Sequence, residues 1–387
     1  MNITRYEEPL LLYSGFYDPD YIHSFVTDSN FFYMTKCDLP NIIVLVHNSK
    51  IYVFTEFGNQ QFFDNETAIK HLLQVFPGCS LHKHSDLKNK LKELNIKKVL
   101  TLPTYKDCKS LNGLKIQFDK DTLEGICIQM RMIKTPEEIR MIKKACQVTS
   151  NAVKFLQKHI KSTMKPLQVI KLFDSFIAKE GMTEYSFLPI LSQNENNRFL
   201  HFTERNFTFK KNGFLLLDIG GQYNHYCSDM TRMFVLNGSL TKLQKELVHI
   251  VSNALEFAKK SVKPGVSWTD LCESVHLKMY QGCLKIGLVK EFFNATEQIK
   301  CMKVLMPHAL GHSVGLDNHD VGNLTVLEEN MVVAIEPGLY FYPGVLQDSS
   351  VKEFFVHKKY KEFLKLGGCR YEDTVLVTGS GSKCLTC

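Results

Sequence analysis

Three histidines lie within the segment "MPHALGHSVGLDNHD", residues 306–320, and histidine can bind a metal or carry a proton near neutral pH. His308 and His312 have the spacing of the zinc-binding HExxH helix, but Ala309 occupies the position next to the first histidine where that motif requires glutamate. Two glycines in the segment also disfavour a stable helix. That motif is therefore rejected, and three histidines in a glycine-rich segment indicate a site only if acidic partners exist elsewhere.

Four carboxylates provide such partners, because each lies in an otherwise apolar, strand-like segment. Burying a carboxylate in such company is costly unless it is paired or bound to a metal. Apolar runs around a Gly-Gly turn region predict a hairpin over 212–238, which would bring two of the four together. With one histidine, the four would form an oxygen-rich site for two divalent cations that share bridging carboxylates, with manganese, cobalt or zinc preferred. The four are Asp218, Asp229, Glu336 and Glu372.

The elements that would position these residues can be read from apolar spacing. A sharp helix start is predicted at Thr135, which can act as N-cap, with Pro136 at the first helical position and Glu138 completing a capping box. The first 120 or so residues alternate strand-like and helical runs, which indicates a small α/β domain. Strands are predicted at 41–56 (two, around a turn), 96–103, 330–341 and 368–379, and helices at 65–76 and 240–262.

Composition limits the classes of partner. The chain is 44% hydrophobic and 22% charged with a net charge of +7. Its lysines gather mainly at 82–98 and 357–365, where acidic residues and spaced leucines interleave, so these are interpreted as solvated helix faces and no nucleic-acid partner is expected. No window reaches the roughly 18 apolar residues of a membrane span, and the start lacks a signal-peptide core. We expect a cytoplasmic protein with no membrane partner.

The twelve cysteines are scattered through a chain large enough to build its own core, which predicts reduced thiols rather than a disulfide framework. Cys384 and Cys387 have CxxC spacing but no second pair nearby. A metal or redox role for them is therefore disfavoured.

Taken together, the segments "LLLDIGGQYNHYCSDMTRMF", "MPHALGHSVGLDNHDVG", "MVVAIEPGLYF" and "GGCRYEDTVLVTGSG" resemble, in order, the motifs of the pita-bread metallopeptidases (family M24). Within that family the chain is similar to the prolidase (Xaa-Pro dipeptidase) group, with aminopeptidase P as a close relative. The resemblance implies an α/β (α+β) fold: an N-terminal creatinase/prolidase-type α/β domain at 1–124 and a pita-bread catalytic domain at 125–387. It also implies a homodimer.

The resemblance carries roles onto five positions of this sequence. It implies that Asp218 binds one metal, that His312 and Glu336 bind the other, and that Asp229 and Glu372 bridge both. The implied cofactor is two divalent ions per subunit, with Mn²⁺ preferred and Co²⁺ or Zn²⁺ as alternatives.

Other polar positions match the family's substrate pocket. His201, His308 and His319 correspond to substrate-contacting histidines, and Arg370 corresponds to the arginine that holds the metal-site carboxylates. The implied reaction is hydrolysis of the Xaa-Pro bond of a small peptide, with proline second, by a metal-bridging hydroxide. Glu336 would accept and shuttle the proton, and His319 or His308 would stabilise the tetrahedral oxyanion.

One departure concerns substrate length. Prolidases carry an arginine between the last histidine and the glutamate strand that binds the dipeptide's carboxylate, whereas here the segment from His319 to Glu336 contains none. Either another base such as Lys358, Lys359 or Arg198 substitutes, or strict dipeptide specificity is lost.

Several alternatives to a dipeptidase remain at this point. The first is an Xaa-Pro aminopeptidase acting on longer peptides. Methionine aminopeptidase fits less well because of the extra N-terminal domain, and creatinase-like chemistry or a non-catalytic binding module would not need the five ligand positions.

Overall fold

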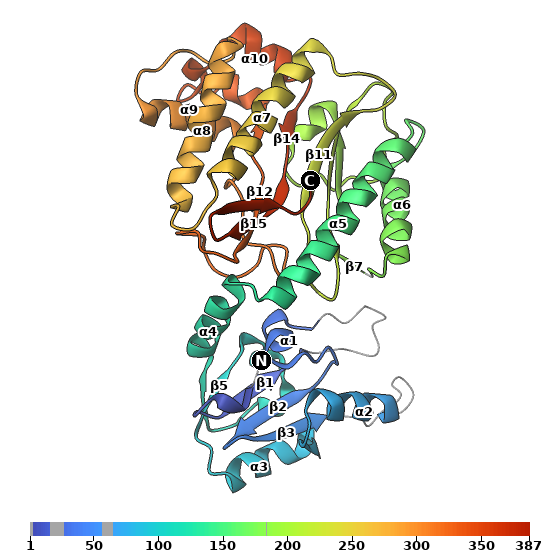
Figure 1. Cartoon of the computed structure of the whole chain (residues 1–387), viewed down its shortest axis with the longest axis vertical. Coiled ribbons are helices and arrows are strands. Elements are labelled where there is room, and N and C mark those ends of the chain that lie inside the picture. Colours follow the sequence, from blue (N-terminus) through green and yellow to red (C-terminus); the bar gives the residue numbers. More distant parts are fainter. Residues whose placement is uncertain (1–2, 16–26, 56–64, 183) are drawn as a thin grey trace. The chain divides into compact units, whose positions relative to one another are not determined.

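The computed structural model describes residues 3–15, 27–55, 65–182 and 184–387 (Figure 1). The chain forms two compact units, Met1–Arg131 and Met132–Cys387. The domain boundary expected after residue 124 lies inside helix α4 (Lys120–Met132), and the division between the two compact units falls in the last turn of the same helix. Glu56, the last residue of the predicted strand pair at 41–56, lies outside the described residues.

The first unit contains a six-stranded mixed sheet with the order β4-β3-β2-β1-β5-β6. Alternate residues of its central strand β1 enter two different apolar clusters, Leu10 and Leu12 in one and Leu11 and Tyr13 in the other, so both faces of the sheet are covered. The predicted strand pair is the hairpin β2–β3, and Asn48 and Ser49 at its turn have positive φ. The elements are β1 (Leu10–Tyr13), α1 (Ser29–Thr35), β2 (Ile43–His47), β3 (Lys50–Thr55), α2 (Asn65–Val75), β4 (Ser80–Lys83), α3 (Leu87–Glu93), β5 (Lys98–Thr101) and β6 (Gln117–Asp119).

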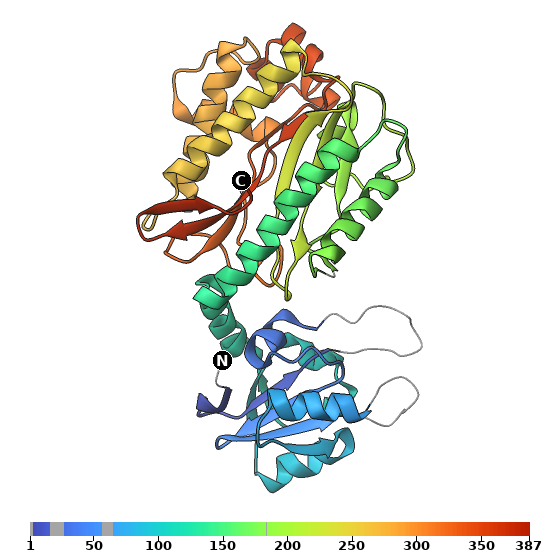
Figure 2. The ribbon, with the colours of Figure 1, turned by 45° about the vertical axis from the view of Figure 1, so that its right-hand side comes forward.

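The second unit opens with the helix predicted from its capping box. Thr135 accepts a hydrogen bond from the Glu138 amide, and Glu138 returns the contact to the Thr135 amide, so α5 (Pro136–His159) begins where the sequence indicates. Helices α5 and α6 (Pro166–Lys179) share an apolar cluster with one face of a three-stranded sheet. Figures 1 and 2 show α5 running alongside that sheet.

The predicted hairpin over 212–238 forms two of the three strands of this sheet, whose order is β11-β9-β8 with β9 in the centre. Strands β9 (Phe214–Ile219) and β11 (Met230–Val235) pair antiparallel, with Asp218 opposite Thr231. Asp229 lies one residue before β11, so the two aspartates are diagonal neighbours rather than a directly facing pair. Leu215 and Leu217 face the α5–α6 cluster, whereas Phe214 and Leu216 face the other core, and the two-residue period places Asp218 on that second face. Strand β8 (Ile190–Gln193) pairs with β9, and β7 (Glu184–Tyr185) pairs with β10 (Gly221–Gln222).

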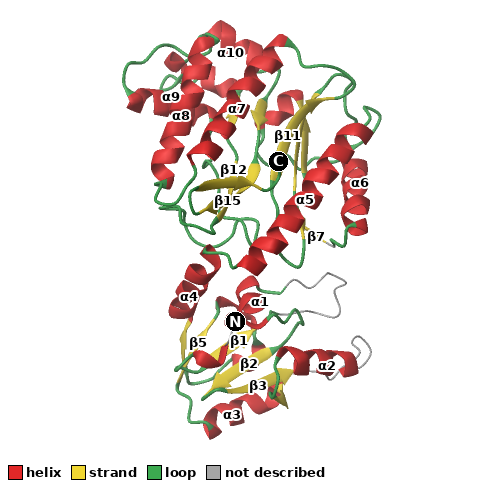
Figure 3. Cartoon of the chain, in the orientation of Figure 1, coloured by secondary structure: helices red, strands yellow, loops and turns green. Residues whose placement is uncertain are grey.

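Each of the two late strand segments is broken into two short strands. The segment 330–341 forms β12 (Val332–Ile335) and β13 (Gly338–Tyr340), and the break contains Glu336. The segment 368–379 forms β14 (Gly368–Arg370) and β15 (Asp373–Thr378), and the break contains Glu372. Strand β12 pairs with β15, and Figure 3 shows these two strands next to each other. Strand β13 pairs with β14, so the two breaks lie beside each other.

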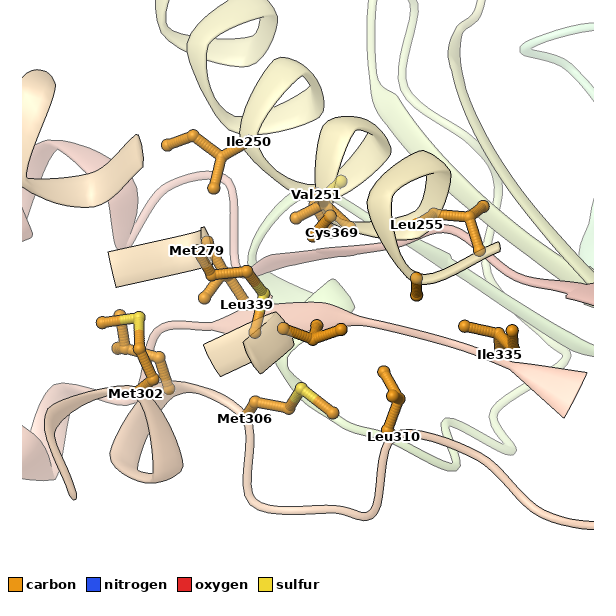
Figure 4. Packing of buried hydrophobic residues seen from close by; sticks show 14 of the residues in the cluster. Ile250, Val251, Leu255, Met279, Met302, Met306, Leu310, Ile335, Leu339 and Cys369 are labelled. Atoms are coloured by element: carbon orange, nitrogen blue, oxygen red, sulfur yellow. The ribbon is translucent and has the colours of Figure 1, made fainter. Parts of the chain in front are cut away.

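The main core lies between these strands and four further helices. Figure 4 shows Val251 and Leu255 of α7 above Ile335 and Leu339, with Met302 and Leu310 on the opposite side of the strands. The side chains interdigitate without polar atoms, and this packing holds the two glutamate-bearing breaks in place. The helices are α7 (Lys242–Ser261), α8 (Trp268–Lys285), α9 (Ala295–Leu305) and α10 (His357–Phe363). Within the described residues, no helix combines the length and apolar character needed to cross a membrane.

The expectation of reduced thiols is wrong for one pair of cysteines. Cys384, at the end of β16 (Gly381–Cys384), forms a disulfide with Cys387, while the other ten cysteines are free. The spacing was seen in the sequence, but the absence of a second CxxC pair argues only against a four-thiolate metal site. Two cysteines three residues apart in a turn need no second pair to reach bonding distance.

Candidate metal centre

The five residues predicted to bind metal come together in one cavity of about 690 Å³. They arrive from separate elements: Asp218 near the end of β9, Asp229 just before β11, His312 from the loop after α9, and the two glutamates from the strand breaks. The predicted substrate residues His201, His308, His319 and Arg370 line the same cavity.

The imidazole of His312 has the tautomer that a metal ligand needs. Its Nδ1 lies 3.0 Å from the carbonyl oxygen of Ser313, and because a carbonyl only accepts, Nδ1 carries the proton. The lone pair of Nε2 is therefore directed into the cluster, 3.5 Å from Asp229 Oδ2 and 3.7 Å from Glu336 Oε1. One ligand atom from each of Asp229, His312 and Glu372 can be chosen so that all lie within 4.8 Å of one another.

Two carboxylate oxygens in this cluster are buried without a hydrogen-bond partner, namely Asp218 Oδ1 and Asp229 Oδ1. Burial raises the pKa of Asp229 and of Glu372 well above the ordinary range. Repulsion adds to this effect, from Asp218 on Asp229 and from Asp229 on Glu372. A bound cation would coordinate the two carboxylate oxygens that have no hydrogen-bond partner, and its positive charge would offset the repulsion between the carboxylates. The donor set of carboxylate oxygens and one imidazole nitrogen therefore fits hard divalent cations.

Arg370 neutralises part of the negative charge of the carboxylate cluster. Its Nη2 donates to Asp218 Oδ2, its Nη1 donates to the Tyr340 hydroxyl at 3.0 Å, and its Nε donates to Thr231 Oγ1 at 3.3 Å. Thr231 in turn donates to Glu372 Oε2 at 2.7 Å. The predicted contact between Arg370 and a metal-site carboxylate is present, and the arginine is buried, with only 3% of the residue exposed.

His308 has both ring nitrogens occupied. Nδ1 donates to the carbonyl oxygen of Ala309 at 2.8 Å, so Nε2 accepts from the Tyr340 hydroxyl at 3.0 Å. Burial lowers the pKa of His308 to about 4, which keeps the ring neutral near pH 7. In this arrangement His308 has no N–H left for a substrate oxygen, which favours His319 for the predicted oxyanion contact.

His319 stacks on the metal-ligand candidate His312, with ring centroids 3.9 Å apart. Burial and the neighbouring His312 lower the pKa of His319, so its ring is also neutral near pH 7 and can donate through one N–H. Asn318, one residue earlier, donates from Nδ2 to Asp229 Oδ2 at 2.8 Å.

The loop that carries these residues is fixed by a buried ion pair. Lys134 Nζ lies 2.9 Å from Asp320 Oδ2, and each side chain is 1% exposed. Asp320 follows His319 directly, its amide donates to the Ser313 carbonyl oxygen, and Gly315 packs so closely that a Cβ there would come within 2.2 Å of Asp320 Oδ2. Lys134 immediately precedes the N-cap of α5, so the helix start positions the histidine loop.

Sequence reasoning missed five residues of this network: Lys134, Thr231, Asn318, Asp320 and Tyr340. Asn318 and Asp320 flank a predicted site histidine, so proximity in the chain was an available signal for both. Lys134 and Asp320 are 186 positions apart, and no spacing rule connects them.

The comparisons with known proteins identify the family of the chain. Residues 140–379 match Metallopeptidase family M24, and because this region is more than half of the chain, the chain belongs to that family. Membership implies divalent metal ions. The chain is 32% identical to the Xaa-Pro dipeptidase of Rattus norvegicus, over 72% of this chain and 62% of that protein. It is 27% identical to a Fusarium vanettenii protein named "Probable Xaa-Pro aminopeptidase PEPP", over 95% and 86% respectively.

Solved structures confirm the predicted fold class. The low-pH form of aminopeptidase P from E. coli superposes with a TM-score of 0.83 at 23% identity, over 99% of this chain and 92% of that one. At this identity the likeness shows the fold, a pita-bread unit with an N-terminal α/β unit. The chain spans less than two thirds of the length of the rat dipeptidase.

The metal-free protein should lose stability as pH rises. Burial raises the pKa of Glu336 from 4.5 to about 8, so between these values the folded chain keeps a proton that the unfolded chain has released. The free energy of unfolding should therefore fall across that window, by at most about 1.4 kcal/mol per pH unit for one group. Urea denaturation of chelator-treated protein from pH 5.5 to 8.5 measures it. Protein saturated with Mn²⁺ should show the opposite slope, because metal binding releases protons, and equal slopes would contradict the assignment.

Lys134→Met should lower the free energy of unfolding by roughly 3–5 kcal/mol, because it removes the ammonium group that balances the buried charge of the Asp320 carboxylate. Urea denaturation followed by the fluorescence of Trp268, the one tryptophan of the chain, measures this change. Adding Asp320→Asn should recover part of the loss. Lys359→Met is the control, since Lys359 pairs with Glu246 at 3.2 Å with both side chains more than 20% exposed, and should cost about 1 kcal/mol or less. Equal losses for Lys134→Met and Lys359→Met would refute the structural role of the pair.

Proposed function

We propose that this chain hydrolyses the peptide bond before a proline at the second position of a peptide, using two divalent metal ions held by Asp218, Asp229, His312, Glu336 and Glu372. The observation that carries the proposal is the convergence of these five side chains in one cavity, with buried acceptor oxygens on two of them that have no protein partner. The membership in a metallopeptidase family and the names of its relatives support the same class of reaction.

The ligand chemistry favours Mn²⁺, because four of the five donors are carboxylates and hard oxygen ligands suit that ion, while Co²⁺ and Zn²⁺ remain possible occupants. When bound, the cations lower the pKa of water and polarise the scissile carbonyl. Asp229 and Glu372 would hold these cations together with His312, since the three side chains offer ligand atoms within 4.8 Å of one another. Arg370 balances the negative charge that remains and keeps Asp218 and, through Thr231, Glu372 in orientation.

Glu336 is the residue suited to move the proton. Its carboxylate borders both His312 and His308, at 3.7 and 4.0 Å, and it lines the cavity where the substrate must lie. Water adds to the carbonyl carbon while Glu336 accepts one of its protons. The C–N bond to proline then breaks, and Glu336 returns the proton to the departing proline nitrogen.

His319 is the residue suited to stabilise the oxyanion. It is neutral, it lines the cavity, and its stacking on His312 fixes the plane of its ring. A donor held in this way needs no reorganisation when charge develops on the carbonyl oxygen. His201 and His308 then form the polar wall of the cavity, and Phe187, Leu188 and Leu200 form its apolar wall, which suits a proline ring.

The lining of the cavity favours peptides longer than a dipeptide. A dipeptide places a free carboxylate close to the scissile bond, and such a group needs a cation. Among the described residues that line the cavity, the only arginine or lysine is Arg370, whose guanidinium already serves Asp218, Tyr340 and Thr231. The substitutes considered from the sequence do not line it: Arg198 donates to a backbone carbonyl of its own turn, and Lys359 pairs with Glu246.

A hydrolysis panel with Mn²⁺ and the three peptides Ala-Pro, Ala-Pro-Ala and Met-Ala-Ser tests the proposal. We expect Ala-Pro-Ala to be cleaved after alanine with a kcat/KM at least about tenfold above that of Ala-Pro, since an unpaired carboxylate in the cavity costs more than 1.4 kcal/mol. Met-Ala-Ser should be left intact. Equal or better cleavage of Ala-Pro would restore the dipeptidase assignment, and cleavage of Met-Ala-Ser would refute proline specificity.

The two stacked histidines form a matched pair of variants. His312→Ala removes a metal ligand, so the purified variant should retain less than the two equivalents of Mn²⁺ expected for the unchanged chain. His319→Ala removes a hydrogen-bond donor, so it should retain both ions and lose about 100- to 1000-fold in kcat. Metal analysis by mass spectrometry together with the tripeptide assay separates the two. If His319→Ala lost metal, or kept full rate, the division of roles would be wrong.

A further inference from the structure

The chain has a single disulfide, which is partly exposed and surrounded in the sequence by cysteines that are free. All twelve cysteines lie in the described residues, ten of them are free, and eight of those ten are buried. Structural disulfides are densest in small domains that cannot build a sufficient hydrophobic core, whereas this chain builds large apolar clusters. Here one CxxC pair at residues 384–387 is joined, and its Cys387 is exposed. An exposed disulfide is open to attack by an external thiolate.

The loop closed by the disulfide contains a buried residue, Thr386, that forms hydrogen bonds with strand β15. Thr386, between the two cysteines, is 0% exposed. Its hydroxyl donates to Asp373 Oδ1 at 2.9 Å and accepts from the Thr374 amide at 3.0 Å, and the Leu385 amide donates to the Thr374 carbonyl oxygen at 2.8 Å. The short loop closed by the disulfide therefore keeps Thr386 hydrogen-bonded to the first two residues of β15.

Asp373 connects this loop to the candidate metal centre. It directly follows Glu372, and Arg232 contacts both residues, through Nη2 to Asp373 Oδ1 and through Nη1 to the Glu372 carbonyl oxygen, each at 2.6 Å. Lys259 Nζ lies 2.7 Å from Asp373 Oδ2 and 3.5 Å from Cys387 Sγ. The disulfide, Asp373 and the backbone of Glu372 are thus joined by an unbroken chain of contacts.

We propose that Cys384–Cys387 is a reversible thiol–disulfide site for a dithiol reductant, and that its oxidised form holds Thr386 on Asp373 and thereby supports Glu372. A thiolate of the reductant attacks one Sγ, the S–S bond breaks, and a mixed disulfide forms. The second thiol of the reductant then displaces that sulfur. The reductant leaves as a disulfide, and Cys384 and Cys387 have gained two electrons and two protons.

Reduction opens the loop around Thr386, so the S–S bond no longer supports the packing and hydrogen bonds of this buried residue. The hydroxyl contact to Asp373 is then lost for part of the time, and the freed Cys387 thiol can compete for Lys259. A second cation site at Asp373, Cys384 and Cys387 is disfavoured, because the Lys259 ammonium already occupies the carboxylate. The reduced form should be less stable and should hold metal at Glu372 less tightly.

The test uses the full chain equilibrated in buffers of reduced and oxidised dithiothreitol. Thiols are alkylated and counted by peptide mass spectrometry, and melting temperature and Mn²⁺ affinity are measured on the same samples. We expect Cys384 and Cys387 to exchange reversibly, with a lower melting temperature and an Mn²⁺ affinity weakened by up to about tenfold in the reduced form.

The double variant Cys384→Ser/Cys387→Ser should behave as the reduced form under all conditions. Cys79→Ser/Cys272→Ser is the matched control, because these two are the partly exposed free cysteines, and it should keep the response to dithiothreitol. Two results would overturn the proposal: no disulfide between residues 384 and 387 in the oxidised buffer, or exchange without any change in melting temperature and affinity. None of these readouts uses peptide hydrolysis, so they remain informative if the proposed function fails.

Discussion

The burial of several carboxylates around one small volume is the constraint on which the rest of this structure depends. Asp218, Asp229 and Glu372 are each 5% exposed or less, and mutual repulsion raises the pKa of two of them. Such a cluster is unfavourable unless positive charge is supplied. Arg370 supplies one charge from the protein, and the remaining excess is the reason that divalent cations fit.

The fold places this cluster where secondary structure is interrupted. Glu336 and Glu372 lie in the breaks of two strand pairs, where the backbone leaves the sheet and directs a side chain away from the apolar faces. Asp218 instead lies within β9, on the face shared with Phe214 and Leu216. The apolar core under α7 and α8 fixes the broken strands, so the packing of ordinary aliphatic residues determines the positions of the charged ones (Figure 4).

Features with a local chemical signature could be predicted from the sequence, whereas features that depend on distant contacts could not. Acidic residues in apolar strands stand out because burial makes them costly, and the capping box at Thr135 stands out because its chemistry is local. The fold class followed from motif order, and the comparisons confirm it. The roles of the five ligand positions stay predictions. The diagonal register of Asp218 and Asp229 and the pairing of Lys134 with Asp320 depend on contacts in space. Local spacing does not encode them.

The central claim is that this cluster is a site for two cations. Anomalous diffraction at the manganese edge from crystals grown with Mn²⁺ tests it most directly. The account predicts two anomalous peaks per chain, both within the cluster of Asp218, Asp229, His312, Glu336 and Glu372. A single peak, or peaks bound by other residues while these carboxylates keep protein partners only, would contradict it.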